Sequence, residues 1–245
     1  MPPKAAASLR APKRLTEESL PRCVAALSKV DSDLARVARE CGAPQMWERE
    51  EGFATLVITI LEQQVSLASA AAAFGRLLAA ASPLTPEKFL AFDDAELRAF
   101  GFSRQKALYC RLVARAVFEG GLDFDALATL DDDAARAALM RLKGVGHWTA
   151  EIYLLRALGR PDAWPSGDLA LQLAAQEVKR LPARPTPAEL DALAEAWRPL
   201  RAVAARMLWA HYLNRPRSAA TRKTLEAEGR AVAAARNPDL KSRAG

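Results

Sequence analysis

Apolar residues recur at three- and four-residue spacing along most of the chain, which predicts an all-α protein. The spacing predicts helices over 16–28, 32–41, 52–62, 64–80, 86–91, 93–98, 103–118, 132–140, 147–158, 168–180, 187–196 and 199–213. Alternating apolar and polar runs joined by Asn-Gly or Asp-Gly turns, which would predict hairpins of strands, are almost absent.

Residues that stop and start helices divide this pattern. Gly42-Ala43-Pro44 ends the helix expected over 32–41. Thr85 is suited to cap the helix expected over 86–91, whose first turn holds Pro86. From Asn214 onwards the chain is rich in Arg, Lys and Ala with little apolar periodicity. This last segment is expected to hold at most one exposed, peripheral helix.

Composition narrows the class of protein. Of the 245 residues, 51% are hydrophobic and 26% charged, as in soluble globular proteins, and no run approaches the roughly 18 apolar residues of a membrane span. The basic N-terminus lacks the apolar segment of a secretory signal. The formal charge of +6 favours a polyanionic partner only modestly. We expect a cytoplasmic monomer, associated with the nucleoid if the source is bacterial.

The chain has few cysteine and histidine residues, so we expect chemistry that does not use a metal ion. Cys23, Cys41 and Cys110 are far apart, and their odd number argues against a disulfide framework and for a reducing compartment. With His147 and His211 as the only histidines, no metal site is expected. No cofactor is expected to be required, and a monovalent cation at the turn described next is left open.

A glycine-bracketed turn, Leu142-Lys143-Gly144-Val145-Gly146, lies between two predicted helices and is followed by His147, Trp148 and Thr149. Its glycines permit positive φ and keep side chains away from the backbone amides at the start of the second helix. Such amides form an anion site together with the helix dipole, and Lys143 adds charge. A plain connector between helices is the alternative.

One acidic residue, Asp168, follows the turn at the start of the next helix, within Trp164-Pro165-Ser166-Gly167-Asp168. Taken alone, it is best explained as a helix N-cap. The cluster of Asp131, Asp132 and Asp133 is explained in the same way, as a solvated helix start.

These segments together resemble the base-excision DNA glycosylase superfamily, whose signature is a helix–hairpin–helix, a Gly/Pro-rich stretch and an aspartate. More narrowly, they resemble the 3-methyladenine DNA glycosylase II branch, over about residues 44–213. Three further segments match that branch in order: Ile60–Ser66 its "ILxQQ(V/I)S", Gly101–Lys106 its "GxSxxK", and Trp197–Arg201 its "WxPxR". Two departures are Lys143, where the family usually has Pro, and the missing N-terminal β-domain of some members.

The resemblance implies roles for individual residues. Asp168 would be the catalytic carboxylate, which stabilises the positive charge developing on the sugar and orients the attacking water. Trp148 occupies the position at which strand-nicking relatives carry a lysine nucleophile, so a hydrolase without lyase activity is expected. Trp148 and Trp209 would line an aromatic pocket for a cationic base, with Tyr153 as a neighbouring candidate. Core packing is the alternative for these aromatic residues.

Gln64 occupies the family's position for a side chain that fills the space left by a flipped base, with a surface glutamine as the alternative. Lys143, Gly144, Val145, Gly146, His147 and Thr149 would bind the backbone of double-stranded DNA. The implied architecture is two helical lobes with a catalytic cleft between them, 15–50 plus 161–215 and 51–160, flanked by a basic tail at 1–14 and a basic extension at 216–245.

The expected function is therefore a monofunctional DNA glycosylase that removes alkylated purines, such as 3-methyladenine or 7-methylguanine, in base-excision repair. A glycosylase for deaminated or oxidised bases is one alternative. A non-catalytic helix–hairpin–helix module that binds DNA, and an interaction scaffold of helices, are the others.

Overall fold

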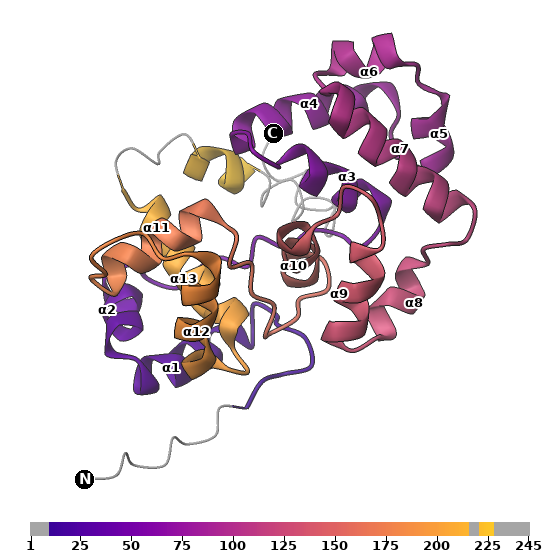
Figure 1. The fold of residues 1–245 in the computed structure, drawn as a ribbon. Helices are drawn as coiled ribbons and strands as arrows, with labels where there is room; N and C mark the ends of the chain where they lie inside the picture. The colour runs from indigo at the N-terminus through magenta and orange to yellow at the C-terminus, as the bar shows by residue number, and fades with distance from the viewer. Residues whose placement is uncertain (1–9, 216–220, 228–245) are drawn as a thin grey trace, which may run out of the picture. The chain divides into compact units, whose positions relative to one another are not determined.

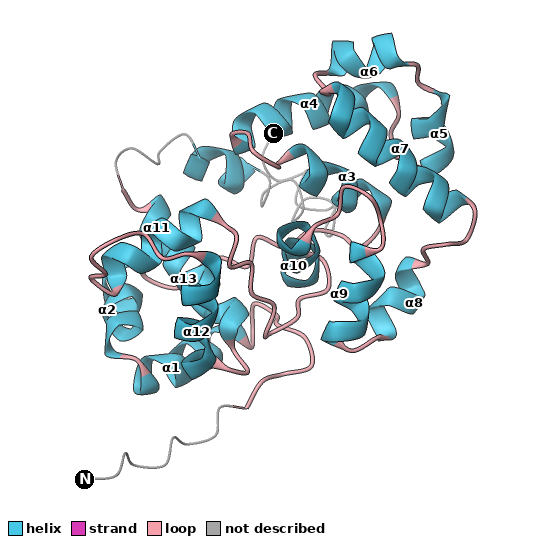
Figure 2. Ribbon diagram, in the orientation of Figure 1, coloured by secondary structure: helices cyan, strands magenta, loops and turns pink. Residues whose placement is uncertain are grey.

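The computed structural model describes residues 10–215 and 221–227, and every regular element within those residues is a helix (Figure 2). The predicted all-α class is therefore confirmed. The chain divides into two compact units, one formed by residues 1–46 and 158–219 and the other by residues 47–157 and 220–245. Of the expected tail and extension, residues 1–9, 216–220 and 228–245 lie outside the described residues.

Unit 1 is built around its last helix, α13. It contains α1 (Leu20–Val30), α2 (Ser32–Cys41), α11 (Leu169–Val178), α12 (Pro187–Ala194), the short 3-10 helix η1 (Glu195–Trp197) and α13 (Arg201–Leu213). α13 packs against α11, α2 and α1 (Figure 1). Its small residues 202–205 are fully buried, which lets neighbouring helices approach closely.

Unit 2 is built around two central helices, α3 and α10. It contains α3 (Phe53–Leu61), α4 (Leu67–Ala80), α5 (Pro86–Ala91), α6 (Asp94–Phe100), α7 (Arg104–Phe118), α8 (Phe124–Thr129), α9 (Asp132–Met140) and α10 (His147–Arg156). α3 packs against α4, α7 and α10, and α10 also packs against α9. Nearly every residue of α3 is buried, as its apolar sequence FATLVITIL requires.

Side-chain caps explain where most helices of unit 2 begin. Ser66, Thr85, Asp93, Ser103, Asp123 and Asp131 each accept a hydrogen bond from a backbone N–H of the helix that follows. Each cap satisfies one of the amides that a helix start leaves unpaired, which stabilises the helix by about 1 kcal/mol. Thr85 and Asp131 cap as predicted.

Several predicted helix boundaries differ from the observed ones, and one observed helix was not predicted. The helix expected over 16–28 begins only at Leu20, because Thr16 and Ser19 hydrogen-bond each other across a turn. α8 was not predicted, since its first turn holds no proline of the kind that marks the equally short α5. Residues 221–227 are helical within the expected extension, and their side chains are exposed or half-buried except that of Leu225, which is 9% exposed.

Within the described residues, no helix is long and apolar enough to cross a membrane. No group of three or more His, Cys, Asp or Glu side chains in the described part of the chain is arranged to hold a metal ion.

Candidate functional site

The loop between α9 and α10 leaves the N-terminus of α10 open. Gly146 is the N-cap residue, with φ −90° and ψ 179°, and none of the described side chains caps the helix there. The Val145 N–H donates to the Leu142 carbonyl oxygen at 3.0 Å and closes the turn before the helix. Because amides at a helix N-terminus carry partial positive charge, the loop has the chemistry of a phosphate site.

The two glycines of this loop have different roles. Gly144 has φ 95°, and a Cβ added there would lie 2.2 Å from Cγ of Tyr109 on α7. Gly146 has an extended φ, and a Cβ added there would meet no atom within 4 Å. The expectation that both glycines supply positive φ is therefore wrong for Gly146. Gly144 is required by the fold, whereas Gly146 leaves open space over the amides.

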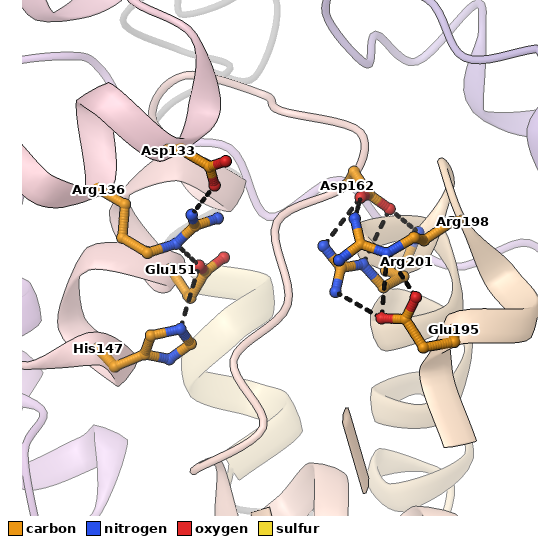
Figure 3. A network of polar contacts seen from close by, with 8 residues as sticks. All are labelled: Asp133, Arg136, His147, Glu151, Asp162, Glu195, Arg198 and Arg201. Atoms are coloured by element: carbon orange, nitrogen blue, oxygen red, sulfur yellow. Dashed lines mark hydrogen bonds and ion pairs between the residues drawn. The ribbon is translucent and has the colours of Figure 1, made fainter. Parts of the chain in front are cut away.

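Two basic or titratable side chains lie exposed at the loop. Lys143 is exposed, and so is His147, the first residue of α10, whose side chain is 48% exposed. The His147 Nε2 lies 3.6 Å from Oε1 of Glu151, whose carboxylate is almost fully buried. Figure 3 shows Glu151 ion-paired in turn with Arg136 of α9, which also binds Asp133. This network ties together the two helices that flank the loop.

Val145 and Thr149 do not offer their side chains to a ligand. Val145 is 5% exposed and Thr149 is 2% exposed. The Val145 N–H is already paired with Leu142, and the Thr149 Oγ1 accepts a hydrogen bond from Gln63 at 2.9 Å. Packing therefore turns both side chains inward, and the prediction that these two residues bind the DNA backbone stays a prediction.

The turn between α3 and α4, residues 62–66, presents Gln64. The helix expected from residue 64 begins instead at Leu67, after its cap Ser66. Gln64 is exposed and has φ 56°, a left-handed conformation that is uncommon for a residue with a side chain. Such a conformation persists only where its surroundings enforce it.

Three contacts hold the chain immediately before Gln64. The Lys106 Nζ donates to the Leu61 carbonyl oxygen at 2.6 Å, and burial lowers the pKa of Lys106. The Glu62 carboxylate is buried and pairs with Arg49 at 2.5 and 3.0 Å, with Arg156 Nη1 at 3.6 Å. Gln63 donates to the Gly144 carbonyl oxygen and to Thr149 Oγ1, both at 2.9 Å.

The roles of Arg49, Arg156 and Gln63 were missed from the sequence. The signal available in the sequence was that these charged and amide residues lie inside or beside apolar runs. A polar side chain buried there needs a hydrogen-bond or ion-pair partner. The sequence does not say which partner, because Gln63 bonds to residues 81 and 86 positions away.

In unit 1, Asp168 stands at the N-cap of α11. Its Oδ1 accepts hydrogen bonds from the Leu171 N–H at 2.8 Å and from the Trp209 Nε1 at 3.1 Å. Trp209 comes from α13 and is half-buried. The carboxylate is therefore oriented by a helix start and by an indole at once, so the N-cap explanation accounts for only one of its two contacts.

The loop that precedes Asp168 is rigidly held. The Asp168 N–H donates to the Pro165 carbonyl oxygen at 2.9 Å. The Gln172 side-chain amide donates to the Ser166 carbonyl oxygen at 2.9 Å. Asp162, earlier in the same loop, accepts hydrogen bonds from both Arg198 and Arg201 (Figure 3). These contacts fix the loop to the start of α13.

The expected pocket aromatics divide into two groups. Trp148 and Trp209 are half-buried. Tyr153 is fully buried in unit 2, where its ring lies against Phe124 and its hydroxyl accepts the Gly52 N–H at 2.8 Å. Burial raises the pKa of Tyr153. These are the contacts of a core residue, so the expectation that Tyr153 contacts a base is wrong.

Comparison with known proteins identifies the family. The family model described as "HhH-GPD superfamily base excision DNA repair protein" matches residues 57–199, more than half of the chain. The chain belongs to the HhH-GPD superfamily. The matched HhH-GPD range contains Gln64, the α9–α10 loop and Asp168, whereas Trp209 lies beyond it.

Individual relatives agree with this HhH-GPD assignment. DNA-3-methyladenine glycosylase 1 of Schizosaccharomyces pombe is 29% identical over 198 residues, which cover 78% of this chain and 87% of that protein. DNA-3-methyladenine glycosylase 2 of Escherichia coli is 30% identical over 127 residues, covering 51% of this chain and 41% of that protein. The chain likewise spans only 43% of a Bacillus subtilis relative.

A solved structure shows the same fold. The 3-methyladenine DNA glycosylase of S. pombe in complex with abasic DNA superposes with a TM-score of 0.72 and 28% identity, covering 77% of this HhH-GPD chain and 95% of that one.

Proposed function

We propose that this protein is a DNA glycosylase that hydrolyses the N-glycosidic bond of alkylated purines in double-stranded DNA and leaves an abasic site. The observation that carries the proposal is the pairing of Asp168 with both the start of α11 and Trp209, in a chain whose α9–α10 loop leaves a helix N-terminus open. The similar glycosylases of S. pombe and E. coli support the same substrate class.

The carboxylate would act on the sugar. As the C1′–N bond breaks, the base leaves with the electron pair and positive charge develops on the sugar ring, which a nearby carboxylate stabilises. Asp168 also orients the water whose oxygen bonds to C1′ and accepts a proton from it. Electrostatic stabilisation of this kind is commonly worth about 3–4 kcal/mol, roughly several-hundred-fold in rate.

The open start of α10 would hold the DNA backbone. Amides near Gly146, together with Lys143 and His147, are suited to bind a phosphate without regard to sequence. Gln64, presented by its turn, would fill the space left by the flipped nucleotide and offset part of the unstacking cost.

The choice of alkylated purines follows from the leaving group. Such bases carry positive charge and depart without a general acid, and the half-buried Trp148 and Trp209 offer ring faces that attract a cation by about 0.5–2 kcal/mol. Trp148 stands where a lyase needs a lysine, so no Schiff base with the sugar can form at that position. We infer that the strand stays intact, that no cofactor is required, and that the protein acts as a monomer.

The test is base release from duplexes that each carry one lesion. We expect release of 3-methyladenine or 7-methylguanine to exceed release of uracil or 8-oxoguanine. Release of only deaminated or oxidised bases would show a glycosylase for those bases instead. Tight DNA binding without release of any base would favour the non-catalytic DNA-binding module.

A further inference from the structure

The side-chain amide of Gln63 connects the turn at residues 62–66 to the α9–α10 loop and the start of α10. The proposed function gives these two segments separate roles. It donates to the Gly144 carbonyl oxygen and to the Thr149 Oγ1, both at 2.9 Å. Because a carbonyl oxygen can only accept a hydrogen bond, the side-chain nitrogen of Gln63 must face Gly144. Both hydrogens of that nitrogen are used in the two hydrogen bonds. One partner precedes the open amides of the loop, and the other lies in the first turn of α10.

The residue that follows Gln63 has little freedom. Gln64 is exposed, with φ 56°. It directly follows Gln63, whose side-chain amide is held by two hydrogen bonds. Glu62, on the other side, is fixed by Arg49 and Arg156. A left-handed glutamine is unfavourable by itself, so these contacts maintain the conformation that exposes its side chain.

From this geometry, and resting on the function proposed above, we propose that Gln63 is a positioning residue that couples the phosphate-binding loop to the insertion of Gln64. A phosphate bound at the start of α10 restricts the loop, and Gln63 transmits that restriction to the turn at residues 62–66. Without the two hydrogen bonds, the protein still binds the DNA backbone, but Gln64 no longer fills the flipped-out space efficiently.

The experiment uses the full-length protein and a product-like duplex, so that no catalysis is needed. The probe is a duplex with a tetrahydrofuran abasic site opposite 2-aminopurine, whose fluorescence reports the stacking of the base opposite the gap. Gln63→Met keeps the side-chain length and removes both donors. Thr149→Val removes one acceptor, Gln64→Ala removes the inserted side chain, and Gln45→Met, at an exposed glutamine of unit 1, is the matched control.

At saturating protein, we expect the parent and Gln45→Met to change the fluorescence equally. Loss of two hydrogen bonds is expected to lower the population of the inserted state about tenfold in Gln63→Met, with a smaller loss in Thr149→Val and little change in duplex affinity. In the Gln64→Ala background, adding Gln63→Met should change neither the fluorescence nor the duplex affinity, whereas a merely destabilising substitution would lower the duplex affinity.

A folded Gln63→Met that retains the parent's fluorescence change would overturn the coupling. So would an equal additional loss in the Gln64→Ala background, or a parent that binds the duplex without any fluorescence change. Release of 3-methyladenine by the same parent preparation tests the proposed function separately: a parent that gives the fluorescence change but releases no base contradicts that function and leaves the coupling intact.

Discussion

Replacing Gly146 by valine separates the binding role of the α9–α10 loop from its role in the fold. The backbone at Gly146 is extended, with φ −90° and ψ 179°, a conformation that valine adopts readily. A Cβ at this position meets no atom within 4 Å, so a side chain can begin there without a clash. Gly144 offers no such test, because its φ of 95° and its proximity to Tyr109 make any side chain disruptive.

The expected magnitude follows from the hydrogen bond between a backbone amide and a DNA phosphate. A valine side chain over the start of α10 would keep a phosphate from reaching the amides there. A hydrogen bond to a charged group contributes about 1.5–3 kcal/mol, so removal of one such bond weakens binding roughly 10- to 150-fold. Because a phosphate contact carries no sequence information, binding should weaken equally for damaged and undamaged DNA.

Fluorescence anisotropy with a lesion duplex and its undamaged counterpart, over several salt concentrations, measures this weakening. Circular dichroism and thermal unfolding establish that the variant is folded. Gly75→Ala is the matched control, since Gly75 is an exposed glycine of α4 with no atom within 4 Å of an added Cβ. A folded Gly146→Val that binds both duplexes as tightly as the parent would show that the loop is only a connector.

Three further predictions concern Asp168, Trp148 and Lys143. Asp168→Asn should keep the fold and the affinity for abasic DNA and lose most base release, about several-hundred-fold in single-turnover rate; near-normal release would remove Asp168 from the mechanism. The parent should produce abasic sites without strand breaks, because Trp148 cannot form a Schiff base; borohydride trapping of an enzyme–DNA adduct would contradict this. Lys143→Ala should weaken binding mildly and flatten the slope of log K against log salt by about 0.9, and an unchanged slope would place Lys143 away from any phosphate.

The start and end of most helices could be predicted from the sequence, because local rules decide them. The ranges 32–41 and 86–91 are those observed, set by Gly42 after the first and by Thr85 and Pro86 at the second. α8, which is as short as α5, was not predicted because its first turn holds no proline, although Asp123 caps its start. The short-range signals of capping and periodicity therefore determined the all-α class and the position of the open loop.

Tertiary structure alone decided how the candidate site is assembled. The same short motif holds one glycine required by Tyr109 and one that is sterically free, and nothing within the motif distinguishes them. Burial turned Val145 and Thr149 inward, and a hydrogen bond from Gln63, 86 positions before Thr149, gave that threonine its partner. The sequence determines which residue types are present and how each segment folds. Contacts between distant segments determine which side chains remain exposed, because burial and hydrogen-bond partners depend on packing that no local pattern records.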